Sequence, residues 1–365
     1  MSEILLLIMA VFAVVGALDR ILGNRLGLGK EFEEGIAAMG SLGLAMLGII
    51  CLAPVLASLL KPVVVPVFRL LGADPAMFAG SILASDMGGG ALALQMTDDP
   101  QAALFGGVLC GSMLGATVVF TIPVAMGILK EEDRPFLAKG ILAGVVTIPV
   151  GLFAGGLVAG MPVLKILLNL IPIVLFAAAI ALGLWRAEGA MIKGFGIFGK
   201  GIIALITIGL AAGIFEGITG IALIPGLAPI EDGFLTVGAI AIVLAGAFPL
   251  VQVLTRVLRK PLLKLGITLG VNETAAAGLI ASLANSIATF NLMKDMDDRG
   301  KVVNVAFAVS AAFVFGDHMG FTAGFAPDWL PAMIVSKLVG GVSAVIVALW
   351  LTKGNCRDRR PRRSA

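Results

Sequence analysis

The sequence predicts an all-α polytopic integral membrane protein, with about nine spanning helices and two re-entrant hairpins arranged as an inverted-topology repeat. Three observations predict this fold: an apolar composition, the placement of basic residues between apolar stretches, and similarity between the two halves. Hydrophobic residues make up 59% of the 365-residue chain and charged residues only 13%, whereas soluble globular proteins contain roughly 25% charged residues. This composition indicates a membrane protein.

Eleven apolar stretches follow one another, each close to the roughly 20 residues that cross a bilayer. They cover residues 4–18, 36–60, 76–96, 101–129, 140–160, 163–185, 201–224, 234–255, 274–293, 302–326 and 332–352. The first stretch lacks a basic n-region and a small-residue cleavage site, so we expect a retained helix and not a signal peptide.

The Lys and Arg residues between these stretches predict the topology. If every stretch crossed the membrane, the basic connections on the two sides of 274–293 would lie on opposite faces, against the positive-inside rule. With 76–96 and 274–293 as re-entrant hairpins, 22 of the 26 Lys and Arg residues fall inside. Only Lys61, Arg69 and Lys165 then lie outside. We therefore expect an external N-terminus and a cytoplasmic C-terminus.

The two halves of the chain resemble each other at a spacing of 197–199 residues. Leu60–Pro62 corresponds to Arg259–Pro261, and Leu71–Asp74 corresponds to Leu269–Asn272. In the topology above, an odd number of spans separates equivalent helices. The halves would then run in opposite senses, which gives the inverted-topology repeat of many transporters.

These patterns divide the chain into four parts. They are a first repeat over residues 1–160 with the re-entrant hairpin 76–96, a linking helix and cytoplasmic loop over 161–200, a second repeat over 201–353 with the re-entrant hairpin 274–293, and a basic cytoplasmic tail over 354–365. A basic tail directly after an apolar helix is typical of a cytoplasmic anchor, so we expect no nucleic-acid partner.

Cysteine and histidine usage argues against metal and cofactor chemistry. Cys51, Cys110 and Cys356 show no paired spacing, so we expect neither a disulfide nor a metal site. One histidine cannot form a His-based metal cluster, and we expect no cofactor. This histidine, His318, has no nucleophile at a recognisable spacing, so we do not expect an enzyme.

The first hairpin contains a break that marks a candidate binding site. Gly88, Gly89 and Gly90 interrupt the apolar stretch and let the chain turn, with Ser85 and Asp86 beside them. Irregular backbone at membrane depth is tolerated where it lines a cavity or is buried in protein. An ionised carboxylate there costs about 2.5–3.5 kcal/mol, and a cationic ligand would offset that cost. Alternatively, Asp86 caps the second half-helix.

The second hairpin offers neutral groups at the equivalent depth. Ser282, Asn285 and Ser286 suit a hydroxyl group or a partly dehydrated ion. Alternatively, they form the interhelical hydrogen bonds that Ser and Asn commonly supply in membrane bundles.

Two further acids stand in apolar stretches. Asp317 and His318 lie halfway along 302–326, and Asp317 could bind the substrate or take part in a proton relay. His318 is a candidate for coupling transport to an ion, or a structural histidine. Glu216 faces the cavity or pairs with a basic residue.

The interior therefore offers acids, hydroxyl groups, amides and phenyl rings, with almost no base. This balance favours a small cation over an anion, and phenyl faces could add about 0.5–2 kcal/mol of cation–π attraction.

The runs Ala84–Ala93, Ser282–Phe290 and Phe315–Gly320 resemble those of the ethanolamine permeases encoded in bacterial ethanolamine-utilisation operons. The resemblance extends over nearly the whole chain. It implies uptake of ethanolamine across the bacterial inner membrane to feed a cobalamin-dependent ammonia-lyase pathway. The ammonium group would then bind Asp86 or Asp317, and the hydroxyl group Asn285 or Ser85.

Alternatives remain open at this point. The hairpin arrangement is also similar to that of concentrative nucleoside transporters, so a nucleoside-type or other small-cation carrier is the second interpretation. An integral membrane enzyme or a channel subunit explains the polar, broken hairpins less well. The sequence leaves the driving ion open, and the analogy with hairpin transporters leaves a homo-oligomer open.

Overall fold

The computed structural model describes residues 2–353, apart from the side chains of a few residues in α1 and α10; the predicted basic tail, 354–365, lies outside the described residues. Every regular element in this range is helical, as the sequence predicts. Seven of the helices described are long and apolar enough to cross a membrane. The protein is therefore an all-helical, polytopic membrane protein.

The α-helices are α1 (Ser2–Ile21), α2 (Leu28–Leu70), α3 (Ala76–Ile82), α4 (Gly89–Met96), α5 (Pro100–Leu104), α6 (Ile122–Ile128), α7 (Arg134–Val145), α8 (Ile148–Val158), α9 (Val163–Thr219), α10 (Ile230–Leu269), α11 (Glu273–Ala284), α12 (Ser286–Leu292), α13 (Asp298–Ala311), α14 (Asp317–Phe325) and α15 (Leu330–Leu351). The π-helices η2 (Phe105–Gly115) and η3 (Thr117–Thr121) join α5 to α6. Short 3-10 helices are η1 (Ser85–Met87), η4 (Glu131–Asp133), η5 (Met293–Asp295) and η6 (Pro327–Trp329).

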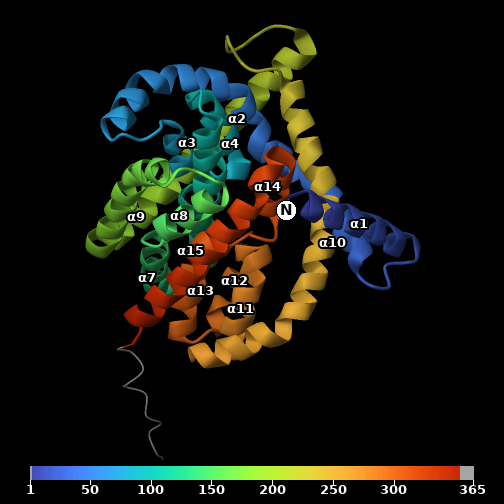
Figure 1. Ribbon diagram of the computed structural model, residues 1–365, viewed down its shortest axis with the longest axis vertical. Coiled ribbons are helices and arrows are strands. Elements are labelled where there is room, and N and C mark those ends of the chain that lie inside the picture. The colour runs from blue at the N-terminus through green and yellow to red at the C-terminus, as the bar shows by residue number, and fades with distance from the viewer. Residues whose placement is uncertain (1, 354–365) are drawn as a thin grey trace, which may run out of the picture.

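Two pairs of short helices form hairpins at the positions that the sequence predicts. The helices α3 and α4 pack against each other, and so do α11 and α12. Figure 1 shows the first pair in the upper half of the molecule and the second pair in the lower half, with α10 running between the two ends. Each hairpin follows a long helix, α2 or α10, and precedes an interrupted one.

The first hairpin packs closely on the π-helix η2 because glycines lie at the contact. A Cβ on Gly80 would overlap the carbonyl oxygen of Gly106, and a Cβ on Gly115 would overlap that of Leu83. Small residues allow this backbone approach in membrane proteins. The wide i→i+5 turns of a π-helix are frequent at functional sites, and here they form the support of the first hairpin.

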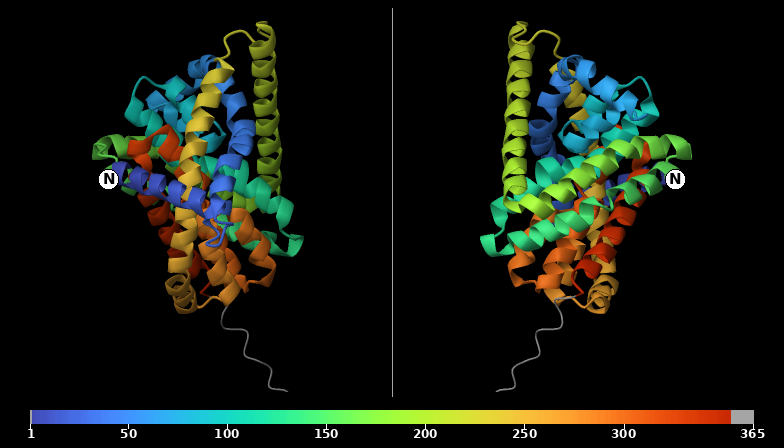
Figure 2. Two further views of the ribbon diagram at one scale, coloured as in Figure 1. Left: turned by 90° about the vertical axis from the view of Figure 1, so that its right-hand side faces the viewer. Right: turned by 90° about the vertical axis from the view of Figure 1, so that its left-hand side faces the viewer.

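The predicted linking region, 161–200, lies almost wholly within α9. The backbone of Ala187 is not helical, with φ −145° and ψ 51°, so α9 consists of two helical parts joined by a kink at this residue. Figure 2 shows the second part of α9 standing upright at the edge of the molecule in both views.

Candidate functional site

The turn of the first hairpin places Ser85 and Asp86 beside α2. Leu83 is extended at the end of α3, and Gly88 has a φ of +86° after η1. A Cβ on Gly88 would overlap Ile49 of α2. Left-handed backbone and close packing therefore both require glycine at this position.

The second hairpin turns at Asn285, whose side chain caps α12. Its Oδ1 accepts the N–H of Ile287 at 2.8 Å. The hydroxyl groups of Ser282 and Thr289 lie 2.8 Å apart, and Thr289 Oγ1 donates to the carbonyl oxygen of Gly278 at 2.9 Å. These bonds hold the two arms of the hairpin together.

A third break, at residues 312–316, separates α13 from α14. Phe313 has a φ of +62° in this break. Its N–H donates to the carbonyl oxygen of Ser282 at 3.0 Å, and the N–H of Phe315 donates to that of Leu283 at 2.9 Å. The second hairpin thus satisfies backbone groups that the break would leave unpaired.

Asp317 and His318 consequently stand in the first turn of α14, and not halfway along a continuous helix as the sequence predicts. The sequence gives little sign of the break because its hydrogen bonds come from a distant segment. A carboxylate at the start of a helix is favoured by the helix dipole.

The first hairpin and the third break border one cavity of about 840 Å³. Its lining includes Ala84, Asp86 and Met87 of the first hairpin, Phe120 and Pro123 of the η3–α6 segment, Lys193 and Lys200 of α9, and Phe313, Asp317 and His318 at the third break. His318 Nε2 lies 3.6 Å from Asp86 Oδ1. The two lysines are exposed, so the cavity reaches the surface beside α9.

The structure thus brings three of the predicted residues, Asp86, Asp317 and His318, to one cavity. Gly88 and Gly89 shape the turn that holds Asp86. Ser85 is fully buried, with no hydrogen-bond partner for its Oγ.

Seven predicted residues do not line this cavity, namely Ser85, Gly88, Gly89, Ser282, Asn285, Ser286 and Glu216. Ser282 and Asn285 have the structural partners described above, and Ser286 is buried with an unpartnered hydroxyl. Glu216 lies near the end of α9, one turn after Gly213, which packs on Cys51 of α2. Its Oε2 is buried without a hydrogen-bond partner, so Glu216 belongs to a different part of the fold.

Lys337 is a functional candidate that the sequence interpretation missed. Its side chain is 1% exposed, and Nζ donates to the carbonyl oxygen of Ser112 at 2.6 Å. It lies close enough to Asp86 for the two charges to interact. The available signal was that Lys337 is the one charged residue in α15.

The cavity is lined by both acidic and basic side chains. Two carboxylates, Asp86 and Asp317, face it together with two phenyl rings, and Lys193 and Lys200 add basic groups. Among residues 2–353, no group of three or more His, Cys, Asp or Glu side chains is arranged to hold a metal ion.

Comparison with known proteins places the chain in a family. The family described as "Ethanolamine utilisation protein, EutH" matches residues 1–351. The chain belongs to the EutH family. Its relatives include a probable ethanolamine permease EutH of Listeria monocytogenes, 59% identical over 96% of this chain and 94% of the relative. No solved structure matches.

Two more EutH-like relatives match over nearly their whole length. A probable ethanolamine permease EutH of Salmonella typhimurium is 49% identical over 96% of this chain and 95% of the relative. An uncharacterised protein, YxeR, of Bacillus subtilis is 50% identical over 100% of this chain and 98% of the relative. The similarity therefore includes both hairpins and the residues that line the cavity.

Proposed function

We propose that this EutH-family protein carries ethanolamine across the bacterial inner membrane through the cavity at Asp86. The names of its relatives support this substrate. The observation that carries the proposal is the convergence of Asp86 and Asp317 on one cavity that also contains two phenyl rings. Ethanolamine carries an ammonium group like that of lysine, so it is mostly a cation at neutral pH.

Each part of the substrate has a partner in this proposal. The ammonium group binds between Asp86 and Asp317, with the faces of Phe120 and Phe313 beside it. The hydroxyl group binds Ser85, whose own hydroxyl has no other partner. His318 Nε2 lies 3.6 Å from Asp86 Oδ1, and His318 serves as the candidate coupling residue.

The proposed topology has nine spans and two re-entrant hairpins. The helix α9 has 57 residues and a kink at Ala187, and each of its two parts is long enough to cross the membrane once. The interrupted pair α13–α14 supplies one further span beyond the seven long apolar helices. The hairpins α3–α4 and α11–α12 are too short to cross and turn back within the membrane.

Reciprocal packing supports an inverted repeat of residues 1–160 and 201–353. The helix α1 packs on α10, and its proposed equivalent, the second part of α9, packs with α2. The first hairpin touches α14 through η1, and the second touches α6. Each hairpin thus meets the interrupted helix of the opposite repeat, as a two-fold relationship requires.

The proposed orientation has the N-terminus outside and the C-terminus in the cytoplasm. Lys193 and Lys200 then lie at the cytoplasmic mouth of the cavity, which supports an inward-facing conformation. Exposed apolar side chains such as Ile208, Ile214 and Ile218 on α9 face lipid or, in a homo-oligomer, a second copy.

Uptake of labelled ethanolamine into proteoliposomes tests the proposed function. Liposomes without protein are the control, because the neutral amine crosses lipid. Saturable equilibration without a gradient indicates a facilitator, and accumulation only with a proton or sodium gradient indicates coupling. Uptake no greater than in the control liposomes would contradict ethanolamine transport and favour another small cation.

A further inference from the structure

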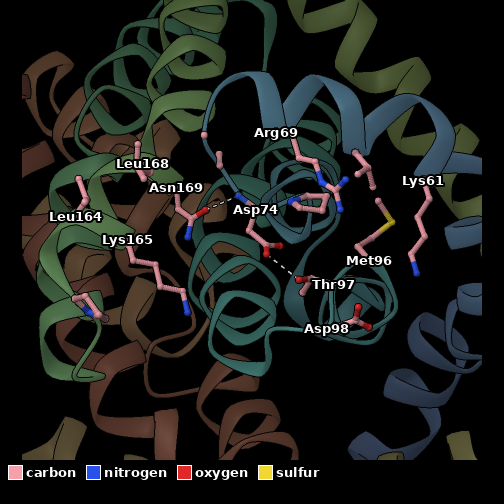
Figure 3. Close-up of a pocket in the computed structure, with 15 residues that line it drawn as sticks. Lys61, Arg69, Asp74, Met96, Thr97, Asp98, Leu164, Lys165, Leu168 and Asn169 are labelled. Carbon is pink, nitrogen blue, oxygen red and sulfur yellow. Dashed lines mark hydrogen bonds between the residues drawn. The ribbon is translucent and has the colours of Figure 1, made fainter.

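A second cavity, of about 760 Å³, lies where the two arms of the first hairpin open. Figure 3 shows it between the end of α2, the residues around Asp74 before α3, the residues after α4, and the start of α9. Three basic residues line it, Lys61, Arg69 and Lys165. These are the three that the charge pattern places on the outer side. It shares no lining residue with the cavity at Asp86.

Two of these basic side chains, Lys61 and Arg69, have no ion-pair partner among the described residues. Lys61, Val65 and Arg69 are spaced by four residues on α2, so they share one face of that helix. Within the part of the chain that the structure describes, no ion pair joins Lys61 or Arg69 to a carboxylate. Both side chains are exposed on the cavity wall.

Two further charged residues of this cavity, Asp74 and Lys165, already have partners. Asp74 Oδ1 accepts the N–H of Ala76 at 2.8 Å, and its Oδ2 accepts the hydroxyl of Thr97 at 2.8 Å. Lys165 Nζ lies 2.6 Å from Asp99 Oδ2. Lys165 is therefore paired with Asp99, whereas in the described part of the chain no ion pair joins either carboxylate to the bases of α2.

A buried amide adds a fixed donor. Asn169 is 3% exposed, and its Oδ1 accepts the N–H of Asp74 at 2.7 Å. That bond assigns the oxygen, so the amide nitrogen remains as a donor on the cavity wall. In Figure 3 this nitrogen points away from Asp74, towards the side of the cavity that holds Lys165.

The surroundings of the cavity are apolar. Leu164 and Leu168 belong to its lining. Leu164 is 69% exposed, and on the neighbouring α2 Val63 is 68% exposed and Leu70 is 88% exposed. Apolar side chains with this exposure face hydrocarbon in a membrane protein. The basic groups therefore lie at the edge of the apolar belt, at the level of lipid head groups.

We propose that this cavity binds a phosphate group, held by Arg69 and Lys61. Guanidinium binds two phosphate oxygens in parallel, and ammonium adds a point charge. Lys165 is paired with Asp99, so Arg69 and Lys61 are the bases available to a phosphodiester. Asn169 and Asp98 offer a donor and an acceptor to the polar remainder of the ligand. The sources of such a group are a phospholipid head group and a soluble phosphate ester.

Thermal unfolding of the purified full-length protein in detergent tests this site. The probes are phosphatidylglycerol, phosphatidylethanolamine, soluble glycerol phosphate, and diacylglycerol, which has the acyl chains without the phosphate. Stabilisation by phosphatidylglycerol or phosphatidylethanolamine alone identifies a lipid site, and stabilisation by glycerol phosphate identifies a soluble ligand. In either case diacylglycerol should have no comparable effect.

The variant Lys61→Gln/Arg69→Gln removes the proposed contacts, and both side chains are exposed, so the fold should persist. Its apparent affinity for the stabilising phosphate probe should be at least about tenfold weaker. The control is Lys260→Gln/Lys264→Gln, which removes the same charge from an exposed face of α10 outside the cavity. Equal affinities in the wild type and the first variant, or equal stabilisation by diacylglycerol, would overturn the proposal. Neither result depends on ethanolamine transport.

Discussion

His318 Nε2 lies 3.6 Å from Asp86 Oδ1 and joins the break of the first hairpin to the first turn of α14. The two residues come from opposite halves of the chain. A substrate ammonium group and the imidazole would compete for the same carboxylate. The pair therefore links substrate binding to the relative position of the two halves.

The variant His318→Gln should flatten the pH dependence of uptake. A protonated imidazole competes with ethanolamine for Asp86, whereas a neutral one does not, so the wild-type half-saturation concentration should rise as the pH falls through the range of about 8 to 5. Ethanolamine stays largely cationic over this range. Initial uptake rates at a series of pH values measure the effect. An unchanged profile in the variant would show that another group controls it.

The variant Gly88→Ala should lose both folded protein and uptake. The backbone at position 88 has a φ of +86°, which costs a residue other than glycine about 1–3 kcal/mol. The added Cβ would also overlap Ile49. Gly201→Ala is the control, since that exposed glycine of α9 has no other atom within 4 Å of an added Cβ. The midpoint of thermal unfolding should fall strongly in Gly88→Ala and stay at the wild-type value in Gly201→Ala. Equal midpoints would mean that the turn of the first hairpin is not as described.

The buried ion pair between Asp133 and Lys301 should stabilise the contact between α7 and α13. Lys301 Nζ lies 2.5 Å from Asp133 Oδ1, and the two side chains are 12% and 3% exposed. Lys301→Met leaves a buried carboxylate without its partner, which costs about 3–5 kcal/mol. Thermal unfolding should show this loss, and adding Asp133→Asn should recover much of it.

The matched control for that pair is Lys130→Met. Lys130 and Glu132 form an exposed pair, 3.7 Å apart, and removing it should cost less than about 1 kcal/mol. Similar decreases in the free energy of unfolding for Lys130→Met and Lys301→Met would contradict a buried ion pair at Asp133.

The ion pair of Asp99 with Lys165 should contribute a small, pH-dependent stability. Burial raises the pKa of Asp99, but the hydrogen bond from Lys165 and the N–H groups of Gln101 and Ala102 outweigh it and hold the pKa below its ordinary value. The stability is therefore present above the unfolded pKa of about 3.9 and is lost as the pH falls through the folded pKa.

The variant Asp99→Asn keeps a capping side chain for α5 but loses the charge. Because Asp99 is 41% exposed, the loss at neutral pH should be below about 1 kcal/mol. Unfolding midpoints of wild type and variant should differ near pH 7 and converge in acid. A difference between the two midpoints that grows as the pH falls would contradict a stabilising charge on Asp99.

The turn of the first hairpin could be predicted from the sequence because its signal is local. Three glycines at 88–90 and a lone Asp86 in an apolar stretch predict a turn with a polar group, and the structure has that turn. The second hairpin has no such local signal and was predicted from the positions of Lys and Arg along the chain; Asn285, predicted as a binding group, caps α12 at its turn.

The rest of the candidate site depends on contacts between segments that are distant in the sequence, and local sequence patterns do not reveal such contacts. The break before Asp317 forms because carbonyl groups of the second hairpin accept its N–H groups. Lys337 is buried because the carbonyl group of Ser112, from the other half of the chain, accepts its ammonium. Glu216 was placed with the other acids by residue type, whereas its position on α9 sets it apart.

Equilibrium binding of labelled ethanolamine to the purified protein tests the central claim most directly. The comparison is between wild type, Asp86→Asn, and Asp232→Asn, an exposed acid of α10 outside the cavity. A hydrogen bond to a charged group contributes about 1.5–3 kcal/mol, so Asp86→Asn should weaken binding about 10- to 100-fold while Asp232→Asn leaves it unchanged. Equal affinity in all three proteins would contradict an ethanolamine site at Asp86.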